Sequence, residues 1–352
     1  MIMRRHVSKV TLTAMVGVIL ILLVIQMLFV FLGQIGDLND KYRIADALHF
    51  VLLQTPGNLY SILPIGALVG AVVGLGSLAS SSELVVMRAS GVSVWHIVGW
   101  VMRPALLLGL TAFGLSQWVI PSTTQSSQFI RSGAAVRDQA VHGYWHKEGN
   151  EFAFISYAND DGALGWVKAF HFSADQRLLD TWVSTTGQYQ SNAVWMLHGV
   201  ANVKLQPTGQ SSLTGADTQA WNVNLKPKLL SAATADPDEL SPSQLFKYGR
   251  LLSSDNAAVP GEYKLSFWTK TLAPLGLLSL VVLACAFVFG SLRSRSMGLR
   301  VVVALLVGLG FRYLQDFIGY VSLVAGGWTV LYVLMPIFGA FLAGGYALRR
   351  AG

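Results

Sequence analysis

The sequence predicts an α+β membrane protein, with six transmembrane helices and an antiparallel β-jellyroll-like domain inserted between helices 3 and 4. Composition is the first reason: 53% of the residues are apolar, 12% are charged and the mean hydropathy is +0.51, a balance foreign to soluble domains. The second reason is the spacing of the charges, because lipid suits long charge-free stretches. Asp, Glu, Lys and Arg are absent from residues 10–36, 47–82, 104–130, 271–292 and 317–348.

Apolar runs place the first two helices. Val10–Gly33 has 24 residues, or about 36 Å of helix, whereas a signal-peptide core has only about 7 to 15 residues. We therefore expect a permanent anchor. The next run is too long for one span, and we expect Pro56 and Pro64 to interrupt it, which leaves a helix over residues 59–79.

The remaining helices are bounded by proline and glycine. We expect the third at Val98–Val119, ended by Pro121, and the fourth at Phe267–Phe289. The pair Gly326-Gly327 separates the fifth from the sixth.

These elements divide the chain into three predicted parts. Residues 1–120 hold helices 1 to 3 with a short cytosolic helix near residues 81–91. Residues 121–262 form a polar, β-rich domain that ends in a return helix, and residues 263–352 hold helices 4 to 6.

Cations in the short loops predict that both termini are cytosolic. With the N-terminus inside, the inner loops collect ten basic residues against a single acidic one, Glu83. The ten are Arg4, Arg5, Lys9, Arg88, Arg103, Arg293, Arg295, Arg300, Arg349 and Arg350. The exported residues 121–266 have 11 basic and 13 acidic residues, so the net charge of +7 reflects this bias and nucleic acid is not an expected partner.

The polar insert alternates apolar and polar residues with a period of two, which is typical of strands. Turn-forming residues separate the runs, so we expect an antiparallel sandwich or roll. The runs are Glu151–Tyr157, Leu164–Phe172, Leu178–Tyr189, Ala193–Leu205 and Thr218–Leu225. Ser241-Pro242-Ser243-Gln244 then resembles a capping box that begins the return helix.

Motifs for nucleotide binding and hydrolysis are absent from the sequence. It contains no G-x-x-x-x-G-K-[ST], G-x-S-x-G or H-E-x-x-H, so we expect no nucleotide site of the phosphate-loop type in this chain. His142 and His146 are four residues apart but fall in a predicted strand, which disfavours a metal site. The single cysteine, Cys285, excludes an intrachain disulfide.

Arg312 and Asp316 are the deepest ionisable residues of the spans. They are one helical turn apart, near enough to neutralise each other. Ionisable residues in a membrane indicate a functional site, and a structural pair that locks helices together is the equally weighted alternative.

The loop between the second and third helices faces the cytosol in this topology. Ser80 and Glu83 fit a capping box and Gly91 fits a C-terminal stop, which predicts a short helix. Its apolar residues, Leu84, Val85 and Met87, have no evident cover within the chain. The helix either lies on lipid or docks in a groove of a cytosolic partner, and we favour docking.

Three segments resemble the lipopolysaccharide export permease family. They are Ser82–Gly91 (SELVVMRASG), Phe289–Ser294 (FGSLRS) and Met297–Val302 (MGLRVV). Trp268 and Lys270 at the start of the fourth helix fit too, and the likeness covers the whole chain. The motif SELV is more similar to the sequence of the G subunit than to that of the F subunit.

The resemblance implies a permease subunit of an ABC exporter that extracts lipopolysaccharide from the outer leaflet of the inner membrane and passes it to a periplasmic bridge. Its implied partners are an LptF-like permease subunit, an LptB-like ATPase homodimer that holds ATP and Mg, and an LptC-like single-pass protein. No cofactor is expected in this chain. The short cytosolic helix becomes a coupling helix to the ATPase, with Glu83, Leu84, Val85, Met87 and Arg88 as its contacts.

A phosphorylated, multi-acyl lipid needs an apolar cavity that opens sideways and cations at its outer rim. The candidates are Lys41, Arg43, Arg131, Arg137, Lys264 and Lys270. Arg131 matches a family arginine, whereas the family's neighbouring cation and its lysine near the end of span one fall at Gln128 and near Val30 in this chain. Interfacial snorkelling is an equal alternative for each lone cation.

Gly66, Gly70 and Gly74 leave a smooth face on the second helix, which favours close packing of another helix over a sliding contact. The resemblance makes spans one and five the moving gate walls. Two other classes compete: a multispan scaffold or sensor with a periplasmic ligand-binding domain, and an intramembrane enzyme, disfavoured because the spans hold no cluster of acid, base and nucleophile.

Overall fold

The computed structural model divides the chain into two compact units. One, the membrane unit, contains the long apolar helices, and the other, the sheet unit, contains all the strands. The structure describes every residue except 1, 37, 39–42, 125–142, 160, 174, 192, 206–210, 235, 255–260, 291–295 and 352, and it describes no side chain at 232 or 251–254.

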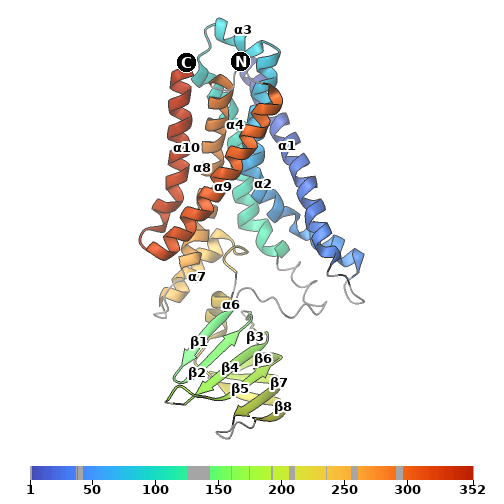
Figure 1. The fold of residues 1–352 in the computed structure, drawn as a ribbon, viewed down its shortest axis with the longest axis vertical. Coiled ribbons are helices and arrows are strands. Elements are labelled where there is room, and N and C mark those ends of the chain that lie inside the picture. Colours follow the sequence, from blue (N-terminus) through green and yellow to red (C-terminus); the bar gives the residue numbers. More distant parts are fainter. Residues whose placement is uncertain are drawn as a thin grey trace. The chain divides into compact units, whose positions relative to one another are not determined.

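Six helices of the membrane unit are long and apolar enough to cross a membrane, counted over the described residues, as predicted. They are α1 (Ile2–Ile35), α2 (Ile44–Ser80), α4 (Val94–Gly114) with its continuation η1 (Leu115–Val119), α8 (Gly261–Phe289), α9 (Met297–Ala325) and α10 (Thr329–Ala351). Figure 1 shows both termini at the same end of this unit as the short helix α3 (Glu83–Ala89).

Two predicted helix ends were wrong, both at prolines. Helix α2 continues through Pro56 and Pro64, and the third span continues past Pro121 to Thr124. Hydroxyl groups beside the α2 prolines bond back to helix carbonyls, as Ser61 Oγ does to Gly57 O at 3.1 Å. Neighbouring helices and such hydroxyls satisfy backbone groups in membrane helices, so proline is tolerated there. Near Pro121 the chain widens into the π-helical turn η1.

Helices α2 and α8 form the centre of the membrane unit. Helix α2 packs against α1, α8 and α9, and α8 also packs against α4 and α10. The side chains of Leu68 and Leu75 on α2 and Leu277 on α8 are fully buried. The other four helices surround this pair.

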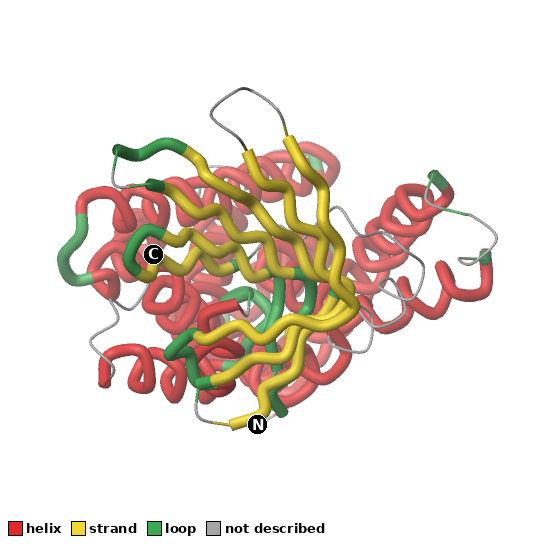
Figure 2. Tube along the Cα trace, turned by 90° about the horizontal axis from the view of Figure 1, so that it is seen from below, coloured by secondary structure: helices red, strands yellow, loops and turns green. Residues whose placement is uncertain are grey.

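The sheet unit is one antiparallel sheet of eight strands in the described ranges. Its strands are β1 (Tyr144–Glu148), β2 (Glu151–Ile155), β3 (Ala163–Leu164), β4 (Val167–Phe172), β5 (Leu178–Ser184), β6 (Thr186–Ser191), β7 (Val194–Leu205) and β8 (Ser211–Asn222). The order is β1-β2-β4-β5-β7-β6-β3, and β8 also pairs with β7. Figure 2 shows that the strands form a single, strongly curved sheet. The roll is therefore confirmed, and the two-sheet sandwich is wrong.

Pattern reading located most strands but missed some boundaries. Strand β1 lies in the segment around His146 that was predicted to be a strand without stated bounds, and a bend at Thr185 divides the run Leu178–Tyr189 into β5 and β6. The Thr185 hydroxyl donates to His198 O at 2.9 Å, which fixes this break on β7. Helix α6 (Pro227–Thr234) adds the fully buried Leu230 to the core of the sheet unit.

The return helix α7 (Pro242–Ser254) begins at the predicted capping box. Ser241 N donates to Gln244 Oε1 at 2.9 Å, and Gln244 N donates back to Ser241 Oγ at 3.2 Å. Both arms of the box are present, so this prediction is confirmed.

Candidate coupling site and headgroup residues

The loop after α2 places Glu83 at the start of α3. Helix α2 ends at Ser80, and Ser82 has a left-handed backbone (φ 62°), which turns the chain sharply into α3. Gly91, with φ 90°, ends the segment as predicted, because glycine adopts this conformation without strain. The helix has 7 residues, which agrees with the short helix expected.

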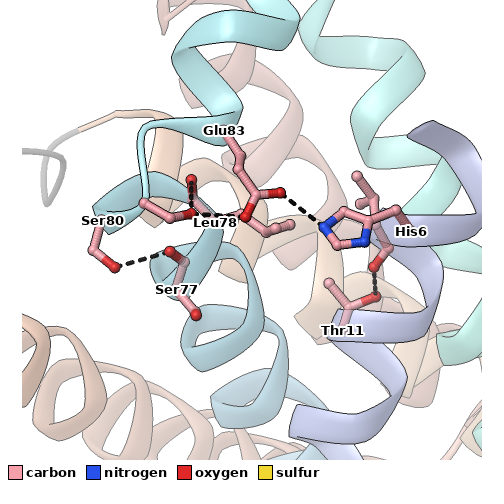
Figure 3. A network of polar contacts seen from close by, with 8 residues as sticks. His6, Thr11, Ser77, Leu78, Ser80 and Glu83 are labelled. Atoms are coloured by element: carbon pink, nitrogen blue, oxygen red, sulfur yellow. Dashed lines mark hydrogen bonds and ion pairs between the residues drawn. The ribbon is translucent and has the colours of Figure 1, made fainter.

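The predicted capping box at Ser80 and Glu83 is wrong. Ser80 is still part of α2, and its hydroxyl donates to Ser77 O at 2.8 Å. The Glu83 carboxylate instead accepts from Ser81 Oγ at 3.0 Å and from His6 Nε2 at 2.7 Å. Figure 3 shows this network, which joins the first turns of α1 to α3.

The hydrogen bonds to Glu83 favour its ionised form. The bond from Ser81, and next the bond from His6, hold the pKa of the Glu83 carboxyl below its ordinary value of 4.5. The Glu83 side chain is 41% exposed. It is therefore a fixed, ionised group that stays accessible from outside the chain.

The apolar face of α3 is divided between the chain and the exterior. Leu84 and Met87 are only 5% and 6% exposed and belong to the core of the membrane unit, so the expectation that nothing covers them was wrong. Val85 and Val86 are 52% and 63% exposed and point outward. The Arg88 side chain is held within the chain, because its Nη1 donates to Ala351 O at 3.4 Å.

Half of the predicted headgroup cations lie outside the described residues, namely Lys41, Arg131 and Arg137. The other three are not alike. Arg43 is exposed before the first turn of α2, and Lys264 is exposed on α8. Lys270 is only 6% exposed, because six residues along a helix turn it to another face from Lys264.

Arg312 and Asp316 do not form the ion pair that their spacing suggested. Both are exposed on α9, and the salt bridges among the described residues do not include them. Arg312 Nη1 instead donates to Ser61 O of α2 at 3.4 Å. Packing against a neighbouring helix draws the guanidinium away from Asp316.

The glycine face of α2 receives α1 in close contact. A Cβ atom at Gly74 would lie 2.9 Å from Thr11 Cα, and one at Gly70 would meet the backbone of Met15. Ile19 lies in the same way against Gly66. The predicted close approach is confirmed.

Histidine and carboxylate side chains also meet in the sheet unit. Cross-strand pairing aligns Glu148, Glu151, His171 and Asp180 in one row over four strands. His171 contacts Glu151 at 3.2 Å and Asp180 at 3.5 Å. Within the described residues no group of three or more His, Cys, Asp or Glu is arranged to hold a metal ion, and His142 lies outside them.

The sequence did not predict the contact of His6 with Glu83 or the hydrogen bond from Gln26 Nε2 of α1 to Asn58 Oδ1 of α2 at 3.2 Å. His6 is 77 residues from Glu83, so no local pattern links them. Gln26 and Asn58 are among the few polar residues in two apolar runs, a signal that could have been used.

The fold defines a multi-pass membrane protein with a sheet domain inserted between its third and fourth spans. The model of the family "Lipopolysaccharide export system permease LptF/LptG" matches residues 5–350, and the chain belongs to this family. It is similar to the lipopolysaccharide export system permease protein LptG of Escherichia coli strain K12, with 31% identity over 99% of this chain and 98% of that protein. The LptG protein of Haemophilus influenzae is 29% identical over 94% of each chain.

The comparisons confirm the predicted family and its G type. They also support a permease subunit of the multi-pass inner-membrane kind and not an enzyme.

Proposed function

We propose that this chain is one permease half of an ABC exporter that extracts lipopolysaccharide from the outer leaflet of the inner membrane and passes it to a periplasmic bridge. Both termini and α3 lie in the cytosol, and the sheet unit lies in the periplasm. Family membership and the cation-rich inner loops support this arrangement. A separate ATPase homodimer of the LptB type binds ATP and Mg and powers export by ATP hydrolysis.

The geometry of α3 is the observation that carries the proposal. Val85 and Val86 offer an exposed apolar surface beside the ionised Glu83, which suits a groove with a cationic edge. Leu84 and Met87 anchor the same helix in the hydrophobic core of the membrane unit. A helix held on one face and free on the other transmits a push from the ATPase to α2 and its neighbours.

Helices α1 and α9 are the proposed gate walls. The buried residues of α1 up to Ile19 lie in its cytosolic half, against the glycine face of α2. Beyond Ile19 many of its large apolar side chains, including Val24 and Phe29, are exposed. The exposed face of this half of α1 can contact an LptF-like subunit, an LptC-like helix or the acyl chains of the lipid.

We also propose the cationic rim, and the burial of each described cation indicates which side chains can reach a lipid headgroup. Arg43 and Lys264 are exposed and can meet lipid phosphates, whereas Lys270 faces the helix bundle. Lys41, Arg131 and Arg137 complete the proposed rim from segments outside the described residues.

The test replaces Val85 with Asp in complexes that are coexpressed with the ATPase and reconstituted in liposomes. A buried charge in the groove should reduce copurified ATPase by about tenfold or more and stop ATP-driven lipid release. Val183→Asp, also at an exposed valine but on β5, is the matched control and should change neither.

Glu83→Ala should reduce ATP-driven lipid release. Its matched control is Glu262→Ala, at an exposed glutamate of α8. Normal ATPase binding and lipid release in Val85→Asp and Glu83→Ala together would contradict the coupling role. Copurification of a kinase in place of an ATPase would favour the sensor alternative.

A further inference from the structure

Polar side chains of α1 and α9 each donate a hydrogen bond to α2 within one helical turn of each other. Gln26 Nε2 of α1 donates to Asn58 Oδ1 of α2 at 3.2 Å. Arg312 Nη1 of α9 donates to Ser61 O of α2 at 3.4 Å. Asn58 and Ser61 are three residues apart on one helix, so these contacts lie on adjacent turns.

Hydrogen-bond donors exceed acceptors in this cluster. Asn58 Nδ2 is buried and has no partner in the part of the chain that the structure describes. A guanidinium carries five N–H donors, and the bond to Ser61 O is the contact that the described residues give Arg312. Because Arg312 is exposed, its remaining N–H groups can reach an incoming acceptor.

The position of Arg312 excludes plain lipid as its surroundings. The residue lies near the middle of α9, it is exposed at the surface of this chain, and Asp316 does not pair with it. A charge at such a place needs water, a partner or a ligand. The surrounding walls, α1 and α9, are the helices with the most exposed apolar faces, which suit acyl chains.

We propose that Arg312, with Asn58 and Gln26, forms a phosphate-binding subsite for the transported lipid, inside the cavity and apart from the cationic rim. The inference rests on the proposed function. Arginine binds phosphate oxygens with a two-pronged, charge-assisted geometry, and Asn58 lies one helical turn from the Ser61 carbonyl that Arg312 contacts. The site holds the headgroup of lipopolysaccharide while α1 and α9 contact its acyl chains.

A photo-crosslinking residue at Leu309, one turn before Arg312, tests this in the complex with its permease partner and ATPase. Leu309 is exposed, and Leu342 on α10 is an exposed control position. We expect a lipopolysaccharide adduct at Leu309 and a weaker one at Leu342. Arg312→Gln should reduce the Leu309 adduct by about tenfold, Arg312→Lys by less because the charge remains, and Asn58→Leu by a smaller factor.

The yield of intact complex and the thermal unfolding midpoint show that each variant folds. An unchanged Leu309 adduct in Arg312→Gln, with normal lipid release, would overturn the subsite and leave the exporter function standing. An adduct made of phospholipid or of the permease partner would overturn it too. Wild-type complex that releases no lipopolysaccharide would overturn the proposed function and the subsite together.

Discussion

Helices α2 and α8 differ from α1 and α9 in burial, although all four have apolar sequences. In the most apolar 18-residue stretch of each helix, 72% of α2 and 61% of α8 is buried, against 11% of both α1 and α9. Apolar composition therefore places a helix in the membrane without saying what it touches. The inner pair forms a scaffold, and the outer pair leaves its faces to lipid, substrate or a partner.

Small residues explain part of this difference. The glycines of α2 allow the backbone of α1 to approach closely, and such contacts stabilise membrane helices where lipid competes equally for apolar side chains. On α9, large residues such as Tyr313, Phe317 and Tyr320 are mostly exposed. These belong to a surface that remains to be covered.

The largest expected effect is in the inner pair. Leu280→Ala on α8 removes a side chain that is 1% exposed, and the cavity should lower the free energy of unfolding by about 2 to 5 kcal/mol. The buried thiol of Cys285 reports unfolding, because a thiol-reactive fluorophore labels it only when the helices separate.

Leu306→Ala on α9, at a side chain 63% exposed, is the matched control and should shift the labelling midpoint by much less. It should instead reduce copurification of the second permease subunit. Equal shifts for the two variants would remove the distinction between scaffold and outer helices.

A somewhat smaller effect is expected at the glycine face. Gly70→Ala forces α1 away from α2 and should cost about 1 to 3 kcal/mol, measured as a lower temperature of Cys285 labelling. Gly17→Ala on α1 has nothing within 4 Å of its added Cβ, so it should be neutral or slightly stabilising. A neutral Gly70→Ala would show that α1 slides on this face.

The smallest effect concerns pH at α3. The pKa of Glu83 is lowered in the folded chain, so its stabilising contribution is complete above the ordinary value of 4.5 and is lost as the pH falls through the lowered pKa. Amide protection in Glu83–Ala89, measured against the intrinsic exchange rate at each pH, should therefore fall below pH 4.5 in wild type. Glu83→Gln should abolish that dependence, and its persistence in this variant would assign it to another group.

Apolar runs and turn residues were sufficient to predict six spans, the inserted sheet and the return helix. They could not predict the path of α2 through Pro56 and Pro64, because the compensating hydroxyls and neighbouring helices are tertiary features. The burial of Leu84 and Met87 was also hidden, since the residues that cover them come from distant helices.

The candidate site was predicted in its segment and not in its contacts. The motif shared with the family located α3, but the hydrogen bond to Glu83 comes from His6 on another helix. Arg312 and Asp316 show the same limit, because helical spacing makes a pair possible while packing against Ser61 decides otherwise.

Sidedness is the claim on which the account depends, and labelling in intact spheroplasts measures it directly. Cysteine placed at Ser90, after α3, or at Asp161, in the sheet unit, is exposed, whereas the native Cys285 is buried and unreactive. We predict that a membrane-impermeant thiol reagent labels Asp161→Cys in intact cells and Ser90→Cys only after lysis. Labelling of Ser90→Cys from outside, or protection of Asp161→Cys until lysis, would contradict it.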